Sequence, residues 1–365
     1  MTENLSFLHP YWHRFGQVSP TYHVTIGIIM VFTTVGAIAG NGLVIWCFIS
    51  FRSLRTSSNV FIINLSIANL LMSLIDFPLL IIASFYHDWP FGQTVCEAYA
   101  TLTGLSGLVT INSLTVIAVD RYCAIVIRVK SVSPAPKWKT YKATIVIWTY
   151  ALFWSLSPVL GWSKYQLEGV RTTCSFDYLT RDATTISFIV AIATCEFAIP
   201  VIVIILAYCK IVTAMIVRRR NLSICKKSEN SSLNFRLQRY RVRAEIRTAF
   251  IIIGLVCLFV VSWLPYTVTA MMGLFGDRTL ITPYLSSVAG LIAKTSTVFN
   301  PIVYAIIHPK FKSKIKCMLY RRNSLNSGAL SKMNSRMSSN KFSSSGFDKQ
   351  QIEFDIKSNR NNDLS

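Results

Sequence analysis

Charged residues are scarce in this sequence, and acidic residues are the scarcest. Only 15% of the 365 residues are charged, with 16 Asp and Glu against 37 Lys and Arg. Soluble domains usually carry about a quarter charged residues, and 52% of this chain is apolar. The composition therefore argues against a soluble globular protein and predicts a membrane protein with several spans.

Two common patterns are also missing. The nine cysteines include no CxxC pair, so neither a zinc site nor a secreted disulfide scaffold is indicated. The first twenty residues have no basic start, long apolar core and cleavage site, so we expect no removable signal peptide. The formal charge of +21 does not indicate nucleic-acid binding, because the basic residues gather in a few polar connections and in the tail.

Long apolar stretches dominate the rest of the chain. A helix needs about 20 mostly apolar residues to cross a bilayer, and seven stretches meet this requirement: 24–50, 59–86, 95–126, 142–162, 184–217, 246–273 and 281–307. The third is rich in small and hydroxyl-bearing residues, which suit a helix enclosed by its neighbours. We expect an all-α membrane protein, a seven-helix bundle with the third helix at its centre.

The charges between the stretches predict the orientation. Basic residues gather after the first, third and fifth stretches, whereas the other connections carry few of them. Because cytoplasmic loops are enriched in Lys and Arg, we expect an extracellular N-terminal segment, 1–23, a transmembrane domain, 24–307, and a cytoplasmic C-terminus. The first stretch would then serve as the insertion signal.

The region after the last stretch divides into two parts. Residues 308–322 place apolar side chains at helical spacing among lysines, which predicts a short amphipathic eighth helix on the lipid of the inner leaflet. Cys317 within it is either a free thiol or a palmitoylation site. Residues 323–365 are rich in Ser and Asn and predict a disordered cytoplasmic tail. Its serines are either phosphate acceptors or simply solvated.

Short motifs in separate stretches point to one family. The third stretch ends in VDRYCAI, the sixth contains FVVSWLPY, the seventh contains NPIVY, the first contains Gly40-Asn41, and Trp148 lies in the fourth. Each motif is short, but all of them occur in the right order and in the right stretches. From about residue 24 to 320 the sequence therefore resembles the rhodopsin-like class of G-protein-coupled receptors.

The resemblance implies a conformational switch at the inner side of the bundle. It assigns a latch to Asp120 and Arg121, with Glu245 as the partner on the sixth helix, because an arginine fork can pair with a carboxylate on a neighbouring helix. The alternative is an arginine that only reaches toward the inner interface. The other switch positions that the resemblance implies are Asn69, Tyr122, Tyr208, Asn300, Pro301 and Tyr304.

The resemblance also has consequences for the outer side. The family joins the positions of Cys96 and Cys174, so we expect a disulfide there, in an oxidising compartment. The triplet Asn4-Leu5-Ser6 is a glycosylation sequon, which predicts a modified Asn4.

One lysine lies inside the seventh apolar stretch. Lys294 is the only charged residue between 281 and 307, and a cation at that depth is costly. It either pairs with an acid or loses its proton and becomes a nucleophile. The sequence AKTSTVFNPIVYA resembles the seventh helix of opsins, and 161–182 resembles their extracellular lid. The resemblance implies 11-cis-retinal on Lys294 as a protonated Schiff base, near Tyr99, Trp263 and Tyr266.

A cation kept in a medium of low dielectric needs an anion nearby. Tyr99 stands where vertebrate visual opsins have a glutamate, as in invertebrate-type opsins, and Glu168 matches the acid that those opsins use instead. Asp76, seven residues beyond Asn69, is a second candidate about two turns further out. We rank Glu168 first, alone or coupled to Asp76. Asp76 could instead be a protonated acid bonded to a neighbour, and a bulge near Pro78 can shift its register.

The combined prediction is a light-sensing opsin of the plasma membrane or a photoreceptor membrane, and not an enzyme. The run HPKFK resembles the signature of rhabdomeric opsins, which favours a Gq-type heterotrimeric G protein, whereas Arg128 departs from the proline that is common at its position. Arrestin and a receptor kinase would act on the serine-rich tail. Two alternatives stay open: a retinal photoisomerase of the same fold, and a receptor for a diffusible ligand with a structural Lys294.

Overall fold

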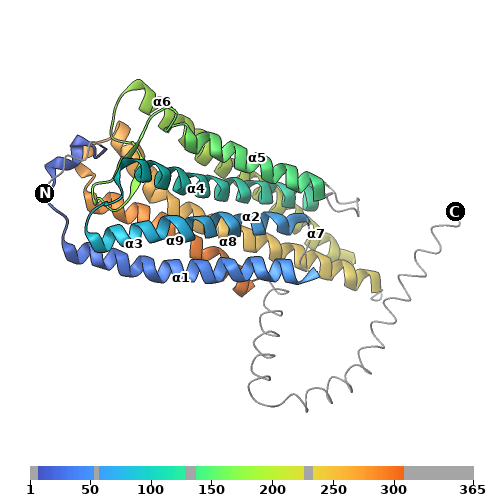
Figure 1. Cartoon of the computed structure of the whole chain (residues 1–365). Coiled ribbons are helices and arrows are strands. Elements are labelled where there is room, and N and C mark those ends of the chain that lie inside the picture. Colours follow the sequence, from blue (N-terminus) through green and yellow to red (C-terminus); the bar gives the residue numbers. More distant parts are fainter. Residues whose placement is uncertain (1–6, 53–56, 128–136, 226–232, 308–365) are drawn as a thin grey trace, which may run out of the picture. The chain divides into compact units, whose positions relative to one another are not determined.

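The computed structural model describes residues 7–52, 57–127, 137–225 and 233–307. In these ranges the chain forms a bundle of long helices that run side by side (Figure 1). The helices and strands, in chain order, are η1 (Pro10–Arg14), α1 (Pro20–Ser50), α2 (Ser57–Leu71), η3 (Met72–Asp76), α3 (Phe77–Tyr86), α4 (Gly92–Tyr122), η4 (Cys123–Ile127), α5 (Lys137–Leu156), β1 (Tyr165–Leu167), β2 (Cys174–Phe176), α6 (Ala183–Ile192), η5 (Ala193–Ala198), α7 (Ile199–Cys225), α8 (Leu233–Phe275), η6 (Arg278–Leu280) and α9 (Pro283–Ile307).

Three of the predicted stretches contain a π-helical turn, in which one extra residue enters the helix. The turn η3 joins α2 to α3, η4 extends α4, and η5 joins α6 to α7. The turn η3 ends two residues before Pro78, so the bulge considered near this proline is present. Counted through these turns, the helices correspond one by one to the seven predicted stretches.

The ends of several helices differ from the prediction, and those of α5, α7 and α8 differ most. The helix α5 covers Lys137–Leu156 instead of 142–162, and it ends where Pro158 disfavours the helical conformation of Ser157. The helix α7 continues to Cys225 instead of 217. The helix α8 begins at Leu233 instead of 246. Its first turns are basic and polar, and a search for apolar residues does not detect a helix of that composition.

Within the described residues, five segments are long and apolar enough to cross a membrane: Pro20–Ser50, Asn59–Tyr86, Gly92–Ile127, Ala183–Arg218 and Ile253–Phe275. The helices α5 and α9 do not pass this test within the described residues, but they belong to the same bundle. The helix α5 packs against α2 and α4, and α9 packs against α1 and α8. The first six residues of α5 include three lysines, and α9 contains Lys294 among several hydroxyl-bearing residues.

The helix α4 is enclosed by other helices, as predicted for the third stretch. It packs against α2, α5, α7 and α8, and glycines let its neighbours approach closely. A Cβ atom on Gly107 would lie 2.6 Å from Cη2 of Trp263 on α8. A Cβ atom on Gly104 would lie 3.3 Å from the ring of Phe176. Small residues on α4 therefore create the space in which the aromatic side chains of the outer half are packed.

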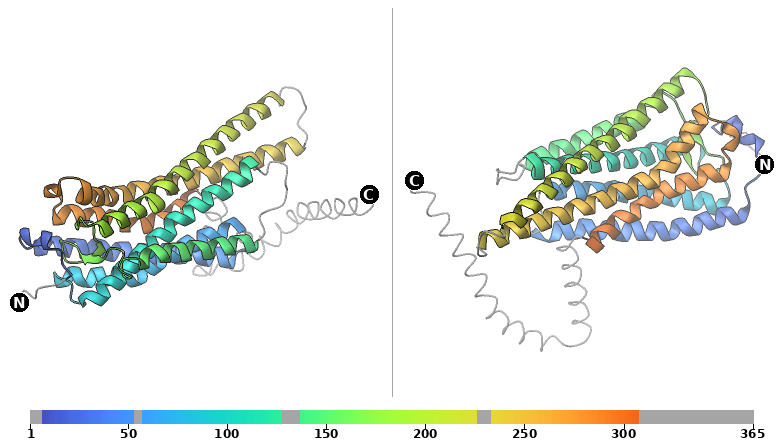
Figure 2. Two further views of the ribbon diagram at one scale, coloured as in Figure 1. Left: turned by 90° about the horizontal axis from the view of Figure 1, so that it is seen from above. Right: turned by 180° about the vertical axis from the view of Figure 1, so that it is seen from behind.

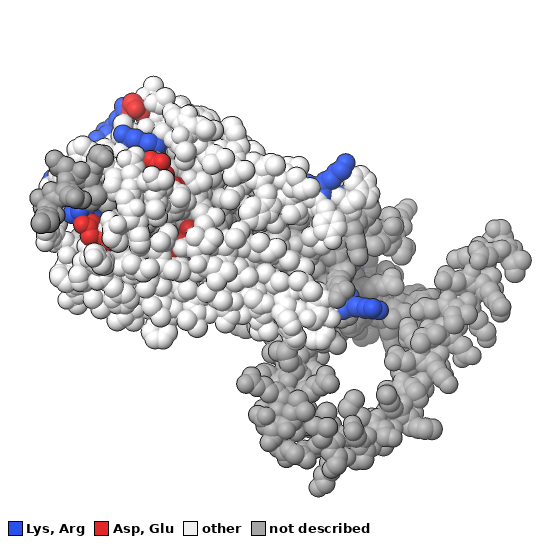
Figure 3. Space-filling view, in the orientation of Figure 1, with Lys and Arg blue, Asp and Glu red and all other residues white. Residues whose placement is uncertain are grey.

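The surface of the bundle is apolar along most of its length. Between the two ends of the face shown in Figure 3, almost no Lys, Arg, Asp or Glu side chain is visible. Large apolar side chains are exposed along the helices of the bundle, among them Phe32, Val35, Ile145, Leu206 and Val261. Such a surface is unfavourable in water, and it suits contact with lipid, where helices satisfy their own backbone hydrogen bonds.

The N-terminal segment and the β-hairpin cover one end of the bundle (Figures 1 and 2). Leu8 makes a parallel bridge with Leu167 of β1. Trp12 packs on Gly169, where a Cβ atom would lie 2.5 Å from the indole ring. The hydroxyl of Tyr11 donates to backbone carbonyls of the α8–α9 connection. The N-terminal segment thus contacts both the hairpin and the α8–α9 connection, and it holds the hairpin against the helix ends.

Candidate functional site

Two adjoining hollows lie under the hairpin and share the side chains of Phe176, Trp263 and Tyr266 as walls. The first, which we call the lysine end, has ≈ 440 Å³ including its open side and is lined in part by Thr103, Glu168, Gly290 and Lys294. The second, the distal end, has ≈ 650 Å³ including its open side and is lined mostly by apolar residues from α4, α6, η5 and α8. Together they form an elongated apolar site with a lysine at one end.

Lys294 is buried on α9 and is only 8% exposed. Its Nζ lies 5.9 Å from the centroid of the Tyr99 ring on α4, a position in which an aromatic face attracts a cation. Glu168 and Asp76 are both within electrostatic range of this nitrogen. None of the ion pairs within 4.0 Å that the described residues make involves Lys294. The nitrogen therefore has acids near it but no acid bound to it.

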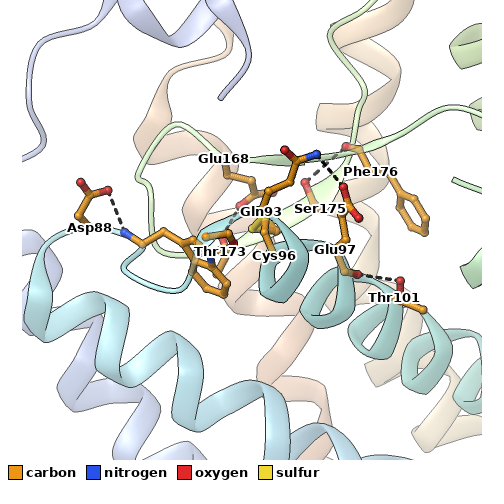
Figure 4. The surroundings of a disulfide bond; sticks show 12 residues. Asp88, Gln93, Cys96, Glu97, Thr101, Glu168, Thr173, Ser175 and Phe176 are labelled. Carbon is orange, nitrogen blue, oxygen red and sulfur yellow. Dashed lines mark hydrogen bonds between the residues drawn. A yellow bond between two sulfur atoms is a disulfide. The ribbon is translucent and has the colours of Figure 1, made fainter. Parts of the chain in front are cut away.

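Glu168 lies in the turn that follows β1 and is 4% exposed. Its Oε2 accepts a hydrogen bond of 2.7 Å from Oγ1 of Thr173, as Figure 4 shows, and its N–H donates to the Thr173 carbonyl at 2.9 Å. A Cβ atom on Gly290 would lie 3.9 Å from both Oε2 of Glu168 and Nζ of Lys294. The acid and the lysine therefore face the same glycine.

The hairpin is anchored at two places. Cys174 of β2 forms the predicted disulfide with Cys96 of α4, with a Cα–Cα distance of 5.5 Å, and Figure 4 shows it beside Glu168. The hydroxyl of Tyr165 on β1 donates to the carbonyl of Ser155 at 2.7 Å, and burial raises the pKa of this tyrosine. Both strands, and with them Glu168, are fixed to the ends of α4 and α5.

Asp76 is fully buried at the last position of η3. Its Oδ2 accepts a hydrogen bond of 3.0 Å from Oγ1 of Thr103, and its Oδ1 has no hydrogen-bond partner among the described residues. Thr103 also lines the lysine end. Asp76 is therefore next to the site but separated from it by a threonine, and it remains a candidate rather than an assigned counterion.

The three aromatic residues predicted for the site lie around it. The ring of Tyr99 is buried against Trp89, with centroids 5.4 Å apart, and faces Lys294. Trp263 stacks on Phe259 at 5.5 Å and meets the edge of Tyr266 at 6.3 Å. Trp263 and Tyr266 stand between the two ends of the cavity, so a ligand that occupies both ends must touch them.

At the inner side, Asp120 and Arg121 are paired with each other. Nη2 of Arg121 lies 2.6 Å from Oδ2 of Asp120. Tyr122 is the last residue of α4, and Tyr208 is buried on α7. The side chains of Glu245 on α8 and Tyr304 on α9 lie outside the described part of the structure, so the proposed partner of Arg121 stays a prediction.

Asparagines connect the inner halves of several helices. Nδ2 of Asn69 donates to Oδ1 of Asn41 at 3.4 Å, and Nδ2 of Asn41 donates to the carbonyl of Thr297 at 3.0 Å. Asn300 is buried one turn further along α9. These bonds link α1, α2 and α9 through neutral amides.

Two of the quoted family motifs have direct packing partners. A Cβ atom on Gly40 would lie 2.6 Å from Cγ of Pro301, so only glycine fits opposite this proline. Nε1 of Trp148 donates to Oδ1 of Asn64 at 2.7 Å, and Nδ2 of Asn64 donates to Ser113 at 2.8 Å. The remaining predictions, Asn4, Cys317, the eighth helix at 308–322 and the tail at 323–365, lie outside the described residues.

The sequence reasoning missed several residues of the site. Glu196 lines the distal end, and its signal was available, because an acid inside an apolar span is a functional candidate by default. Thr103, Thr173 and Gly290 gave no such signal. They are ordinary residues that matter because of side chains that other elements bring to them.

Comparison with known proteins agrees with this geometry. The family model "7 transmembrane receptor (rhodopsin family)" matches residues 40–304. The chain is 35% identical over 309 residues to the rhodopsin of Loligo forbesii, covering 84% of this chain and 68% of that protein. It is also 35% identical over 314 residues to "Rhodopsin, GQ-coupled" of Mizuhopecten yessoensis, covering 84% and 62%. The crystal structure of squid rhodopsin matches with a TM-score of 0.81 and 33% identity, over 86% of this chain and 89% of that one.

The fold and these matches show that the chain belongs to the rhodopsin family of seven-transmembrane receptors. Within that family it is an opsin of the invertebrate type, a member of the light-sensing receptors that carry a retinal chromophore. The predicted fold class and function are thereby confirmed. The protein is a multi-pass membrane receptor that signals through a G protein, which is consistent with the expectation that it is not an enzyme.

Proposed function

We propose that this opsin takes 11-cis-retinal on Lys294 and activates a heterotrimeric G protein of the Gq type. The observation that carries the proposal is the buried Lys294 at one end of an elongated cavity with aromatic walls, beside the acid of the lid. When bound through a Schiff base, retinal supplies absorption of light and a change of shape on isomerisation.

The residues that line the cavity fit such a ligand. Most of the side chains that line the distal end are apolar or aromatic. Gly290 lines the lysine end beside Nζ of Lys294, and a Cβ atom at this position would be in van der Waals contact with that nitrogen, at 3.9 Å. A long hydrocarbon attached at this nitrogen can extend past Trp263 and Tyr266.

The charges around Lys294 suit a nitrogen that stays cationic. A cation in low dielectric is stabilised by an anion in contact or near contact. Glu168 faces the same glycine as the nitrogen, and Thr173 holds its carboxylate in place. Asp76 adds a second acid through Thr103. We assign the main counterion role to Glu168 and a supporting role to Asp76.

The same site has a mechanical connection to the inner side. Trp263 is on α8, two residues before Pro265, which removes a backbone hydrogen bond from that helix. A ligand that changes shape against Trp263 would favour a conformation with α8 displaced outward, which is a shift between two populations of the bundle. In our proposal Arg121, with Asp120, Tyr122, Tyr208, Asn69, Asn300, Pro301 and Tyr304, forms the switch that opens, and Glu245 is its partner on α8.

The remaining parts of the proposal concern orientation and partners. The excess of Lys and Arg in alternate connections supports an extracellular N-terminus and a cytoplasmic C-terminus. The name of the Mizuhopecten relative, "Rhodopsin, GQ-coupled", favours a Gq-type partner. We assign 308–322 to an amphipathic helix on lipid, and 323–365 to a tail that a receptor kinase and arrestin recognise.

The decisive experiment replaces the lysine. The opsin, Lys294→Ala and Lys164→Ala are expressed, given 11-cis-retinal in the dark and measured by absorption spectroscopy. Lys164 is the matched control, because it is a half-exposed lysine of the lid that pairs with Asp177 at 3.6 Å. We expect a light-sensitive band in the wild type and in Lys164→Ala, and none in Lys294→Ala. A band that persists without Lys294, or a folded wild type that forms no pigment, would contradict the proposal.

Two further measurements separate the alternative functions. Light-dependent nucleotide exchange on purified Gq, compared with other G proteins, tests signalling directly, and a receptor for a diffusible ligand would show no light dependence. Illumination with excess all-trans-retinal, followed by analysis of the released isomers, tests the photoisomerase. We expect exchange on Gq and no catalytic release of isomers.

A further inference from the structure

Glu196 is a buried acid that the proposed function does not use. It lies in the π-helical turn η5, is 2% exposed and lines the distal end of the cavity. Its surroundings there are apolar and aromatic, among them Ile189, Ile192, Phe197 and Phe259. An acid in such surroundings destabilises the fold unless its oxygens have hydrogen-bond partners, and an acid inside a span is a candidate for a function.

Only one of its two oxygens has a partner. Oε2 accepts a hydrogen bond of 2.6 Å from Nδ2 of Asn112, whereas Oε1 has none among the described residues. Nδ2 of Asn112 also donates to the carbonyl of Leu108 at 3.0 Å, so both of its hydrogens are in use. Asn112 therefore cannot also donate to Oε1, which is left able to form a hydrogen bond with a bound ligand.

The backbone directs this side chain. A π-helical turn adds one residue to a helix and rotates the residues beyond it, and such turns are frequent at functional sites. In this span the turn occurs at Ala193–Ala198, with Glu196 inside it. The acid thereby lines the same hollow as Trp263 and Tyr266, which separate it from the lysine end.

We infer that Glu196 is a specificity-determining residue that binds a hydroxyl group on the end of the ligand remote from Lys294. The preferred chromophore would then be a retinal hydroxylated on its ring, rather than unsubstituted retinal. This inference rests on the proposed function, because a ligand attached to Lys294 that outgrows the lysine end extends into the distal end. A hydroxyl there can donate to Oε1 or accept from the acid.

The test compares unsubstituted with ring-hydroxylated retinal on four proteins. Purified opsin is mixed in the dark with 11-cis-retinal or with its 3-hydroxy or 4-hydroxy ring derivative, and the rate of pigment formation is recorded with the absorption maximum. The variants are Glu196→Leu, Glu196→Gln and, as control, Glu97→Gln, which changes an acid that lines neither end of the cavity. We expect the wild type and Glu97→Gln to favour one hydroxylated ligand about tenfold, as one additional hydrogen bond allows. Glu196→Leu should lose the preference, and Glu196→Gln should keep part of it.

A second measurement needs neither light nor covalent attachment. β-Ionone and its ring-hydroxylated derivative are used as competitors that slow pigment formation. The hydroxylated fragment should compete better in the wild type, and both should compete equally in Glu196→Leu. In infrared spectra of the regenerated pigment, the carbonyl band that disappears in Glu196→Gln should shift between the two retinals.

The possible results distinguish a failure of the inference about Glu196 from a failure of the proposed function. Equal rates and equal competition for the two ligands in the wild type would overturn the inference, and would mean that Oε1 binds only a water molecule. A preference that survives in Glu196→Leu would also overturn it, because the hydroxyl would then be bound elsewhere. A folded wild type that forms no pigment with any of the retinals would instead overturn the proposed function.

Discussion

The two acids near Lys294 are held in opposite ways. Glu168 belongs to a loop that a disulfide and a hairpin fix to the end of the bundle, and it faces the lysine across Gly290. Asp76 belongs to a turn within a helix, is fully buried, and reaches the site through Thr103. The position of Glu168 therefore depends on contacts between distant parts of the chain, whereas that of Asp76 depends mainly on its own helix.

This difference separates two tasks. An acid on a lid can follow movement of the outer end of the bundle, so its distance to the lysine can change between conformations. An acid inside a helix keeps its place and contributes a constant field. The two acids should therefore differ in how strongly they respond to changes elsewhere in the lid, and four variants test that.

The largest effect should come from removal of the disulfide. Replacing Cys96 and Cys174 by Ser opens a loop of sequence separation 78, and the loss of this restraint lowers the free energy of unfolding by up to about 4 kcal/mol. Glu168 should lose its fixed position, whereas Asp76 should not. Thermal unfolding and the dark rate of attack by hydroxylamine measure the change. Cys209→Ser, at an exposed free cysteine, is the control, and equal behaviour of the two variants would contradict the role given to the lid.

The next effect is that of Glu168→Gln on the pigment. Without the carboxylate, the cationic nitrogen loses its main stabilising charge, and the visible band should disappear at a pH lower by about 1–3 units. Titration of the absorption spectrum in the dark measures this shift. Glu97→Gln is a matched control, because the Glu97 carboxylate accepts a hydrogen bond from Gln93 and lines neither end of the cavity. A titration that is the same in wild type and Glu168→Gln would remove Glu168 as counterion.

Asp76→Asn should also move the loss of the visible band to lower pH, but by a smaller amount, about one pH unit or below. Thr103 separates this acid from the site, so its influence is indirect. The double variant with Glu168→Gln measures coupling between the acids, and Glu97→Gln, at an acid that lines neither end of the cavity, is again the control. A larger shift from Asp76→Asn than from Glu168→Gln would reverse the ranking.

The smallest effect is expected from Thr103→Val. This change leaves Asp76 without its hydroxyl donor and should lower the free energy of unfolding by about 1 kcal/mol. The control is Thr101→Val, since the Thr101 hydroxyl bonds the Glu97 carbonyl of its own helix at 2.7 Å. Thermal unfolding of both variants measures the difference. If Thr101→Val lowered the free energy of unfolding as much as Thr103→Val, the hydrogen bond to Asp76 would add no stability beyond that of an ordinary threonine in a helix.

Part of this site could be predicted from the sequence because it depends on single segments of the chain and on covalent chemistry. Lys294 is the only charged residue of the seventh apolar stretch and precedes Asn300 by six residues, and the Cys96–Cys174 pair follows the family pattern. The enclosed position of α4 is a consequence of its small residues. Each of these properties belongs to one segment of the chain or to one bond.

The remainder depends on side chains that meet from different elements. Nothing near Gly290 in the sequence indicates that Glu168 and Lys294 lie on either side of it. The bond between Asp76 and Thr103 likewise requires the register of two helices. The early start of α8 was missed because a polar helix outside the apolar stretch has no hydropathy signal, and the turn that directs Glu196 into the cavity breaks the regular period.

The π-helical turns η3, η4 and η5 have a consequence for how positions are counted. One added residue changes the phase of a helix by about 100°, so the segments before and after a turn have different angular frames. The direction in which Asp76 points around the helix axis therefore depends on whether a regular helix is extended to it forward from Asn69 or backward from Pro78. Adding or deleting one residue within η3 or η5 would reorient the outer half of that span and leave the contacts of its inner half in place. The ligand-facing half can thus diverge between receptors while the signalling half keeps a common geometry.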